Sequence, residues 1–142
     1  MKLRLREANM EDSSWIRMVR NSQENSWAFG NQRVGKEEHE DYMAKNIDKY
    51  WICESFSLYG WTKVGWCGIV DKDIRICTHS QWKQKGVGSF MLQELQRHTK
   101  DEFSDSFAKV KWDNEASKKL FLRNGFKPVF LTFKKEGEED EV

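Results

Sequence analysis

The sequence predicts a single α/β domain in which strands and helices are arranged around one strand–loop–helix unit. Residues 73–79 carry isoleucine at alternate positions, Ile74 and Ile76, which is typical of a strand. A glycine-containing loop follows, and apolar residues then recur at helical spacing from Val87 to Leu95. With 142 residues and 38% hydrophobic content, the chain suits one domain with its own core.

The first half of the chain predicts one strand, two helices and a hairpin. Residues 2–6 alternate between charged and apolar side chains, which indicates a strand with a positively charged outer face. Residues 12–14 offer helix-capping side chains, so we expect a helix of about two or three turns there. A second helix is predicted over residues 36–46. Residues 50–56 and 61–70 are predicted as two strands joined by a turn.

The second half predicts a further strand, a helix and a last strand. The strand covers residues 107–112, and Asn114 is placed to cap the helix that follows. Gly125 stands where a left-handed residue ends a helix. The last strand covers residues 127–133, where Pro128 favours an edge or an irregular start.

Charge separates the body of the chain from its end. Residues 136–142 hold five acidic side chains, which leaves 24 basic and 18 acidic side chains before them, a net charge of +6. We expect one domain over residues 1–134 and a disordered acidic tail over residues 135–142. The basic body suits an anionic ligand, although it does not indicate a nucleic acid partner.

Three cysteines, Cys53, Cys67 and Cys77, are widely spaced and form no metal-binding motif, so we expect reduced core thiols and no metal. We find no signal peptide and no long apolar run. We therefore expect a cytoplasmic protein without a membrane partner.

The glycine loop has a chemical consequence. The first N–H groups of a helix lack partners within it and attract anions, phosphates in particular. Gly86 and Gly88 have no Cβ, so the backbone there allows close approach, and Lys83 and Lys85 add positive charge. An ordinary strand-to-helix turn has the same pattern. The dinucleotide fingerprint is not met, because Met91 stands where its third glycine would be, and there is no Walker A sequence.

Two motifs, one after the other along the chain, resemble those of the acyl-coenzyme A N-acyltransferases of the GNAT superfamily. Lys83-x-x-Gly86-x-Gly88 resembles their Arg/Gln-x-x-Gly-x-Gly/Ala pyrophosphate loop. Residues 114–126 resemble their Asn-x-x-Ala-x-x-x-Tyr-x-x-x-Gly-Phe helix. The resemblance spans residues 73–126 in the correct order and spacing.

Two departures from these motifs affect the chemistry. Lys83 keeps the positive charge but loses the forked geometry with which Arg binds phosphate. Phe121 replaces the Tyr that many members use to protonate the leaving thiolate. A thiol with a pKa of about 8.5 still leaves tolerably as a thiolate. We assign no general acid.

The resemblance implies a mixed, mostly antiparallel sheet of six or seven strands with about four helices. Two central parallel strands, residues 73–79 and 107–112, would be splayed apart, with acetyl-coenzyme A in the gap as cosubstrate. Asn114 has helix capping as an alternative role. The coenzyme-binding residues that the resemblance implies are Ile76, Cys77, Thr78, Lys83, Gln84, Lys85, Gly86, Val87, Gly88, Ser89, Asn114, Ser117 and Phe121.

On the same pattern, the backbone N–H near Thr78 polarises the thioester carbonyl. The amine arrives protonated and needs a base or a water chain. Asp73, His79 and His39 are the candidate bases. Each has a structural alternative, respectively a turn residue, a strand terminator and a solvent-facing helix residue.

A looser resemblance concerns the acceptor. Arg20-Asn21 and the later Glu37-Glu38-His39 resemble a GNAT branch that acetylates amino groups on nucleotide-linked sugars, including enzymes of pseudaminic acid synthesis. Arg20, Trp27, Phe29 and His39 are then candidate acceptor-binding residues, with core packing as the alternative for the aromatic pair.

The leading hypothesis is an N-acetyltransferase acting on a small amine on a nucleotide-linked sugar. A protein N-terminus or lysine, an amine on a modified nucleobase, and a non-catalytic coenzyme A sensor or scaffold are the alternatives. A homodimer is left open.

Overall fold

The computed structural model describes residues 1–30 and 32–137. Its sheet has four antiparallel strands in the order β1-β2-β3-β4. These are β1 (Leu3–Glu7), β2 (Tyr50–Ser57), β3 (Gly60–Val70) and β4 (Asp73–Thr78). The strands predicted near residues 2–6, 50–56, 61–70 and 73–79 are therefore confirmed, with no strand end shifted by more than one residue.

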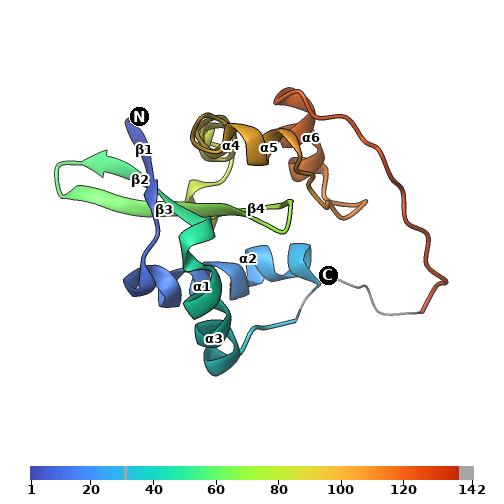
Figure 1. Cartoon of the computed structure of the whole chain (residues 1–142), viewed down its shortest axis with the longest axis horizontal. Coiled ribbons are helices and arrows are strands. Elements are labelled where there is room, and N and C mark those ends of the chain that lie inside the picture. Colours follow the sequence, from blue (N-terminus) through green and yellow to red (C-terminus); the bar gives the residue numbers. More distant parts are fainter. Residues whose placement is uncertain (31, 138–142) are drawn as a thin grey trace.

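Helices cover both faces of the sheet (Figure 1), with α1, α2 and α3 on one side and α4, α5 and α6 on the other. The α-helices are α1 (Ser13–Asn21), α2 (Gln23–Ser26), α3 (Lys36–Asn46), α4 (Val87–His98), α5 (Lys100–Ser104) and α6 (Glu115–Arg123). The 3₁₀ helices are η1 (Met10–Asp12), η2 (Trp27–Phe29), η3 (Ile47–Lys49) and η4 (Ser80–Trp82). The expected mixed α+β fold is confirmed.

Each face of the sheet has its own core. Met91 and Leu95 of α4 are fully buried in the cluster that also holds Ile74, because residues four apart lie on one face of a helix. Ile16 of α1 belongs to the cluster on the opposite face, together with Cys77. Successive residues of β4 therefore serve different cores, as the alternation of a strand requires.

Within the described residues, backbone hydrogen bonds join the free edge of β4 to the later chain only at Phe107. A parallel bridge joins Asp73 to Phe107, where the Ile74 N–H donates to the Phe107 carbonyl at 2.8 Å and the Phe107 N–H donates to the Lys72 carbonyl at 2.8 Å. Within the described residues, no further backbone hydrogen bond joins β4 to residues 108–112. The prediction that these two segments part is therefore correct. The predicted strand 107–112 is wrong beyond its first residue, because a segment that leaves the edge has no partner for a ladder.

The predicted last strand over residues 127–133 is also wrong. This segment forms an arm that leaves α6 and runs apart from the helices (Figure 1), and Phe130 and Phe133 are 93% and 86% exposed. Strand formation requires a neighbouring edge as well as suitable residues, and the arm lies against none. The sheet accordingly has four strands in the described structure, not six or seven. Most of the predicted tail, residues 138–142, lies outside the described residues, and the division at residue 134 stays a prediction.

The three cysteines are buried and unbridged, as predicted. Burial raises the pKa of Cys53 and of Cys77 to about 12, which keeps both as thiols near neutral pH. Over the described ranges, no cluster of three or more metal-ligating side chains occurs. None of the described helices has the length and apolar character needed to cross a membrane.

The sequence suggested a positively charged outer face for β1, but in the structure its charged side chains have acidic partners. The Arg6 guanidinium donates to both Asp12 carboxylate oxygens at 2.9 Å, and Lys63 Nζ lies 2.7 Å from Asp12 Oδ1. Arg4 pairs with Glu54 at 2.8 Å. Tertiary folding brings these acidic partners from η1 and β2, so the charges of β1 are paired across the sheet.

Asp12 is the centre of this cluster and is 1% exposed. Burial alone would raise the pKa of the Asp12 carboxyl, but hydrogen bonds from Arg6, Lys63 and the Asn9 N–H outweigh burial and hold the pKa well below its usual range. A carboxyl whose pKa is lowered by folding stabilises the folded state above its ordinary pKa. That stabilisation is lost as the pH falls from about 4 toward the folded value.

We expect Asp12→Asn to lower the free energy of unfolding by about 3 kcal/mol at pH 7, because two cations lose their buried partner. Urea denaturation between pH 7 and pH 3 measures this, and the difference in the free energy of unfolding between wild type and variant should narrow below about pH 4. Asp48→Asn is the control, since Asp48 is exposed on η3. A difference in the free energy of unfolding that stays constant down to pH 3 would contradict the lowered pKa of Asp12.

Candidate active site

A tight loop carries the chain from η4 to the start of α4. Gln84 and Gly86 both have left-handed backbone, with φ of 63° and 82°. Gly86 is the N-cap of α4, and a Cβ built on it would meet no atom within 4 Å. No acidic residue lies in the first turn of α4, so the N–H groups there face open space without a competing carboxylate. This loop fits the pyrophosphate of a coenzyme.

Gly88 has a packing role that the sequence did not predict. A Cβ at Gly88 would lie 3.1 Å from Leu120 Cδ2, so its absence lets α4 pack closely on α6. Val87 is 1% exposed in the core, and Ser89 Oγ lies 3.2 Å from Asn124 Nδ2 on the α6 side. The side chains of the first turn of α4 thus serve packing, and only its backbone is left for an anion.

The two lysines of the loop flank it on the outside. Lys83 Nζ donates to the Glu24 carbonyl at 3.2 Å, which ties the loop to α2. Lys85 Nζ lies 5.5 Å from the centre of the Trp82 ring. Lys83 therefore combines a structural contact with the positive charge that the resemblance requires at this position.

The open edge of β4 presents hydrogen-bond donors to the gap. Because the Ile74 N–H points to Phe107, alternation along the strand turns the N–H groups of Ile76 and Thr78 toward the same edge. The Thr78 carbonyl faces the same edge, because the His79 N–H beside it donates to Val64 of β3, and it accepts from Asn25 Nδ2 at 3.1 Å. Cys77 is 5% exposed and packs away from the α4 core. The Thr78 N–H therefore lies where the sequence placed the group that polarises a carbonyl.

Of the three candidate bases, His39 lies in the interior. It is 7% exposed, and its Nε2 donates to the Ser13 carbonyl at 3.0 Å, because a carbonyl only accepts. Burial lowers the pKa of His39. The expectation of a solvent-facing histidine is wrong, and its ring joins α3 to α1.

His79 ends β4 and caps the next element. Its Nδ1 accepts from the Gln81 N–H at 3.2 Å, and its ring stacks on Trp15 with centroids 6.5 Å apart. In a neutral imidazole the hydrogen is then on Nε2, so the only lone pair is already in use. His79 is therefore poorly placed to accept a proton.

Asp73 lies at the closed end of the gap, where β4 is bridged to Phe107. Its Oδ2 lies 3.6 Å from Arg75 Nε, and its side chain is 21% exposed. A carboxylate with one loose ion pair retains acceptor capacity for a proton or a water chain. Asp73 is thus the candidate base that both lies at the β4 edge and keeps free lone pairs, whereas His39 is buried against α1.

A polar network beside Asp73 was missed at the sequence level. Arg75 Nη1 donates to Tyr42 Oη at 2.7 Å, and the hydroxyls of Tyr42 and Tyr50 lie 2.9 Å apart. Burial is the main cause that raises the pKa of Tyr50 above its ordinary value. The two tyrosine partners of Arg75 lie 33 and 25 residues away in the chain, so no local pattern reveals them.

The candidate acceptor residues are largely engaged in internal contacts. The Arg20 guanidinium contacts Asn21 Oδ1 and the carbonyls of Phe29 and Gln32, and burial lowers the pKa of Arg20. The Phe29 ring packs on Trp66 with centroids 6.1 Å apart, as its core-packing alternative predicted.

Trp27 Nε1 donates to the Glu24 carbonyl at 3.0 Å. Trp27 therefore shares an acceptor with Lys83, which places it near the coenzyme loop, whereas His39 lies apart on α3.

The second motif forms α6 as expected. Asn114 Oδ1 accepts from the Ser117 N–H at 3.1 Å, which is the capping role. Phe121 is 8% exposed and meets Phe126 edge-on, with ring centroids 5.1 Å apart. Phe121 is thus a core residue in this fold.

Residues 2–127 match the family model described as an acetyltransferase (GNAT) domain. The chain belongs to the GNAT acetyltransferase family. Acetyl-coenzyme A is accordingly its cosubstrate, and the open backbone at Gly86 fits that molecule's pyrophosphate. No curated protein sequence matches the chain.

Solved structures share the fold. A domain from Methanocaldococcus jannaschii has a TM-score of 0.80 at 20% identity, covering 90% of each chain. A putative acetyltransferase from Salmonella typhimurium, solved with acetyl-CoA, has a TM-score of 0.74 at 15% identity, covering 96% of this chain and 88% of that one. Spermidine N-acetyltransferase from Vibrio cholerae, solved with CoA and spermine, has a TM-score of 0.69 at 15% identity, covering 87% and 79%.

We expect His79→Asn to keep turnover within about threefold of wild type, because Asn caps a helix start as well as the imidazole does. His79→Ala should lose about 1 kcal/mol of stability through the missing cap. Thermal unfolding and steady-state kinetics on both variants measure this. A fall in kcat of several orders of magnitude in a stable His79→Asn protein would instead identify His79 as the base.

Proposed function

We propose that this protein acetylates a primary amine of a small molecule by direct attack on the thioester in a ternary complex. The observation that carries the proposal is the edge of β4 that stays without a backbone partner beyond the Asp73–Phe107 bridge within the described residues. This edge carries the Ile76 and Thr78 N–H groups and is followed along the chain by the loop at Gly86, where a Cβ would meet no atom within 4 Å.

Each part of the gap has a role in this proposal. The N–H groups from Gln84 to Ser89 hold the pyrophosphate, with Lys83 beside them. The Thr78 N–H donates to the acyl carbonyl and stabilises the negative charge that develops on its oxygen. Acetyl-coenzyme A supplies an activated acyl group and a thiolate leaving group.

Proton transfer is assigned to Asp73 through a chain of water molecules, because Asp73 is the candidate base on this edge with acceptor capacity to spare, and it stands five residues from Thr78, about 16 Å along the strand. Arg75 holds this carboxylate and is itself held by Tyr42. No general acid is assigned, because the buried ring of Phe121 has no proton to donate.

The coenzyme site is tested by comparing Gly86→Asp with Gly86→Asn. Both side chains tolerate left-handed backbone better than most and have nearly the same shape, so they differ mainly by one negative charge. We expect Gly86→Asp to weaken acetyl-coenzyme A binding at least about tenfold relative to Gly86→Asn, because the carboxylate repels the pyrophosphate. Calorimetry on both folded variants measures the difference, and equal affinities would remove the basis of the proposed function.

For the acceptor we propose an amino group on a nucleotide-linked sugar. The net charge of +6 before residue 136 supports an anionic acceptor over a polyamine, which would be repelled. The support drawn earlier from Arg20 and His39 is weaker, since both side chains bond within the fold. A protein N-terminus or lysine and an amine on a modified nucleobase are the competing acceptors.

We expect nucleotide-linked amino sugars to be acetylated with a kcat/KM at least about tenfold above that of peptides or free polyamines. A competition assay at fixed acetyl-coenzyme A measures this. A peptide amine with far higher kcat/KM would exclude the sugar while leaving the acetyltransferase assignment in place.

A coenzyme A-binding module without catalysis is the second candidate, favoured by the buried Phe121 at the motif's tyrosine position. Thioester consumption with any of these amines excludes it. A homodimer stays a prediction, supported by the exposed apolar side chains of the arm over residues 127–133.

A further inference from the structure

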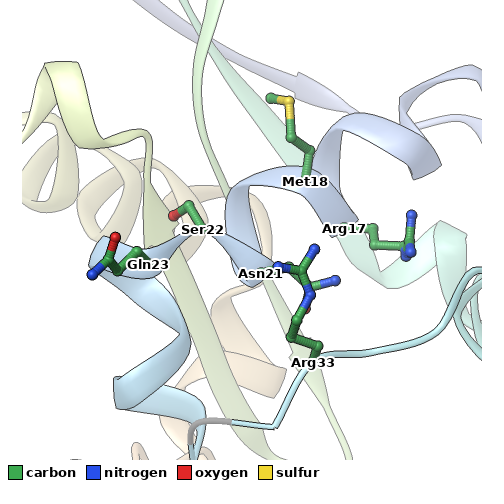
Figure 2. A pocket seen from close by; sticks show the side chains of 6 residues that line it. All are labelled: Arg17, Met18, Asn21, Ser22, Gln23 and Arg33. Atoms are coloured by element: carbon green, nitrogen blue, oxygen red, sulfur yellow. The ribbon is translucent and has the colours of Figure 1, made fainter.

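A hollow of about 360 Å³ lies where α1 ends and α2 begins. Figure 2 shows side chains from α1, from the start of α2 and from the segment before α3 around it. None of the lining residues is acidic. They are Arg17, Met18, Asn21, Ser22, Gln23 and Arg33.

One backbone unit, Val34, holds the Arg17 side chain and fixes the backbone next to Arg33. Asn21 accepts from the Val34 N–H at 3.0 Å and donates to the Val34 carbonyl at 3.0 Å. Arg17 Nε donates to the same carbonyl at 2.9 Å. Because Asn21 is buried and fixed to α1, Val34 is anchored, and its neighbour Arg33 is placed at the hollow that Arg17 also lines.

The charge of this pair is not balanced locally. Within residues 1–30 and 32–137, no carboxylate forms an ion pair with Arg17 or Arg33, and no side-chain hydrogen bond of Arg33 occurs. Two cations fixed at one hollow repel each other unless an anion lies between them. Guanidinium groups with free N–H donors bind phosphate or carboxylate oxygens through paired hydrogen bonds.

The hollow is connected to the end of β4 through α2. Ser22 and Gln23 line the hollow, while Asn25 donates to the Thr78 carbonyl at 3.1 Å. The Glu24 carbonyl accepts from Lys83 of the coenzyme loop. One short helix thus separates the arginine pair from the end of the gap.

We propose that this hollow binds the diphosphate of the acceptor, with Arg17 and Arg33 as its specificity-determining residues. The proposal rests on the proposed function and names its substrate class, an amine carried on a diphosphate. Two guanidinium groups match the charge of two linked phosphates better than that of a single carboxylate.

The test is calorimetric titration of the full chain with inorganic pyrophosphate, uridine diphosphate and acetate, with the coenzyme site saturated by coenzyme A. We expect both phosphate compounds to bind, and Arg33→Gln to weaken them about tenfold or more. Arg123→Gln removes the same charge from the end of α6 and should change nothing. Arg33-dependent binding of acetate without binding of the phosphates would overturn the diphosphate assignment. Equal losses of phosphate affinity in Arg33→Gln and Arg123→Gln would also overturn it, because they would show attraction to the overall charge of the protein and not binding at the hollow.

Kinetics separate this proposal from the proposed function. In an active protein, Arg33→Gln should raise KM for diphosphate-linked acceptors about tenfold with kcat unchanged. If acetylation proceeds but KM does not change, the hollow is not the acceptor site and the acetyltransferase assignment stands. If no amine is acetylated while pyrophosphate binding still depends on Arg33, the hollow stands as a diphosphate site and the proposed function fails.

Discussion

The pair of backbone hydrogen bonds between the start of β4 and Phe107 is the constraint on which the site depends. These two bonds hold the segments together at Asp73 and end there, so the rest of the β4 edge keeps its donors unpaired. Unpaired backbone donors inside a fold require a partner. A ligand that lies along β4 would provide acceptors for the N–H groups of Ile76 and Thr78. A neighbouring strand paired along the whole of β4 would leave no room for such a ligand.

The rest of the site is positioned by polar contacts that cross between elements. Asn25 ties α2 to the Thr78 carbonyl, and Lys83 ties the coenzyme loop to the same helix. Nearer the start of β4, Arg75 connects Asp73 to Tyr42 of α3. The wall made by α1, α2 and α3 is thus coupled both to β4 and to the coenzyme loop.

Tertiary packing divided the predicted site residues into two groups. Gly86 has the left-handed backbone at a helix start that local chemistry favours for glycine, and its role in binding coenzyme stays a prediction. His39, Arg20 and Phe29 each contact a partner from another element, respectively the Ser13 carbonyl, the 29–32 segment and Trp66. A polar or aromatic residue in sequence does not reveal whether its partner is a ligand or the protein itself.

The sequence alone determined the four strands of the sheet and the positions of α3, α4 and α6, because these rest on periodicity and local motifs, which act over a few residues. The parting of β4 from the segment at Phe107 was implied by the family resemblance, and the binding of coenzyme by the loop at Gly86 stays a prediction. Only the tertiary structure decided that residues 127–133 form no strand, that Gly88 serves helix packing, and that Asn21 and Val34 bring Arg17 and Arg33 to one hollow. The physical reason is that a strand forms only beside the edge of another strand, that a glycine allows close packing only where another element lies against it, and that the position of a charged side chain depends on the groups that hold it. Each of these comes from a distant part of the chain.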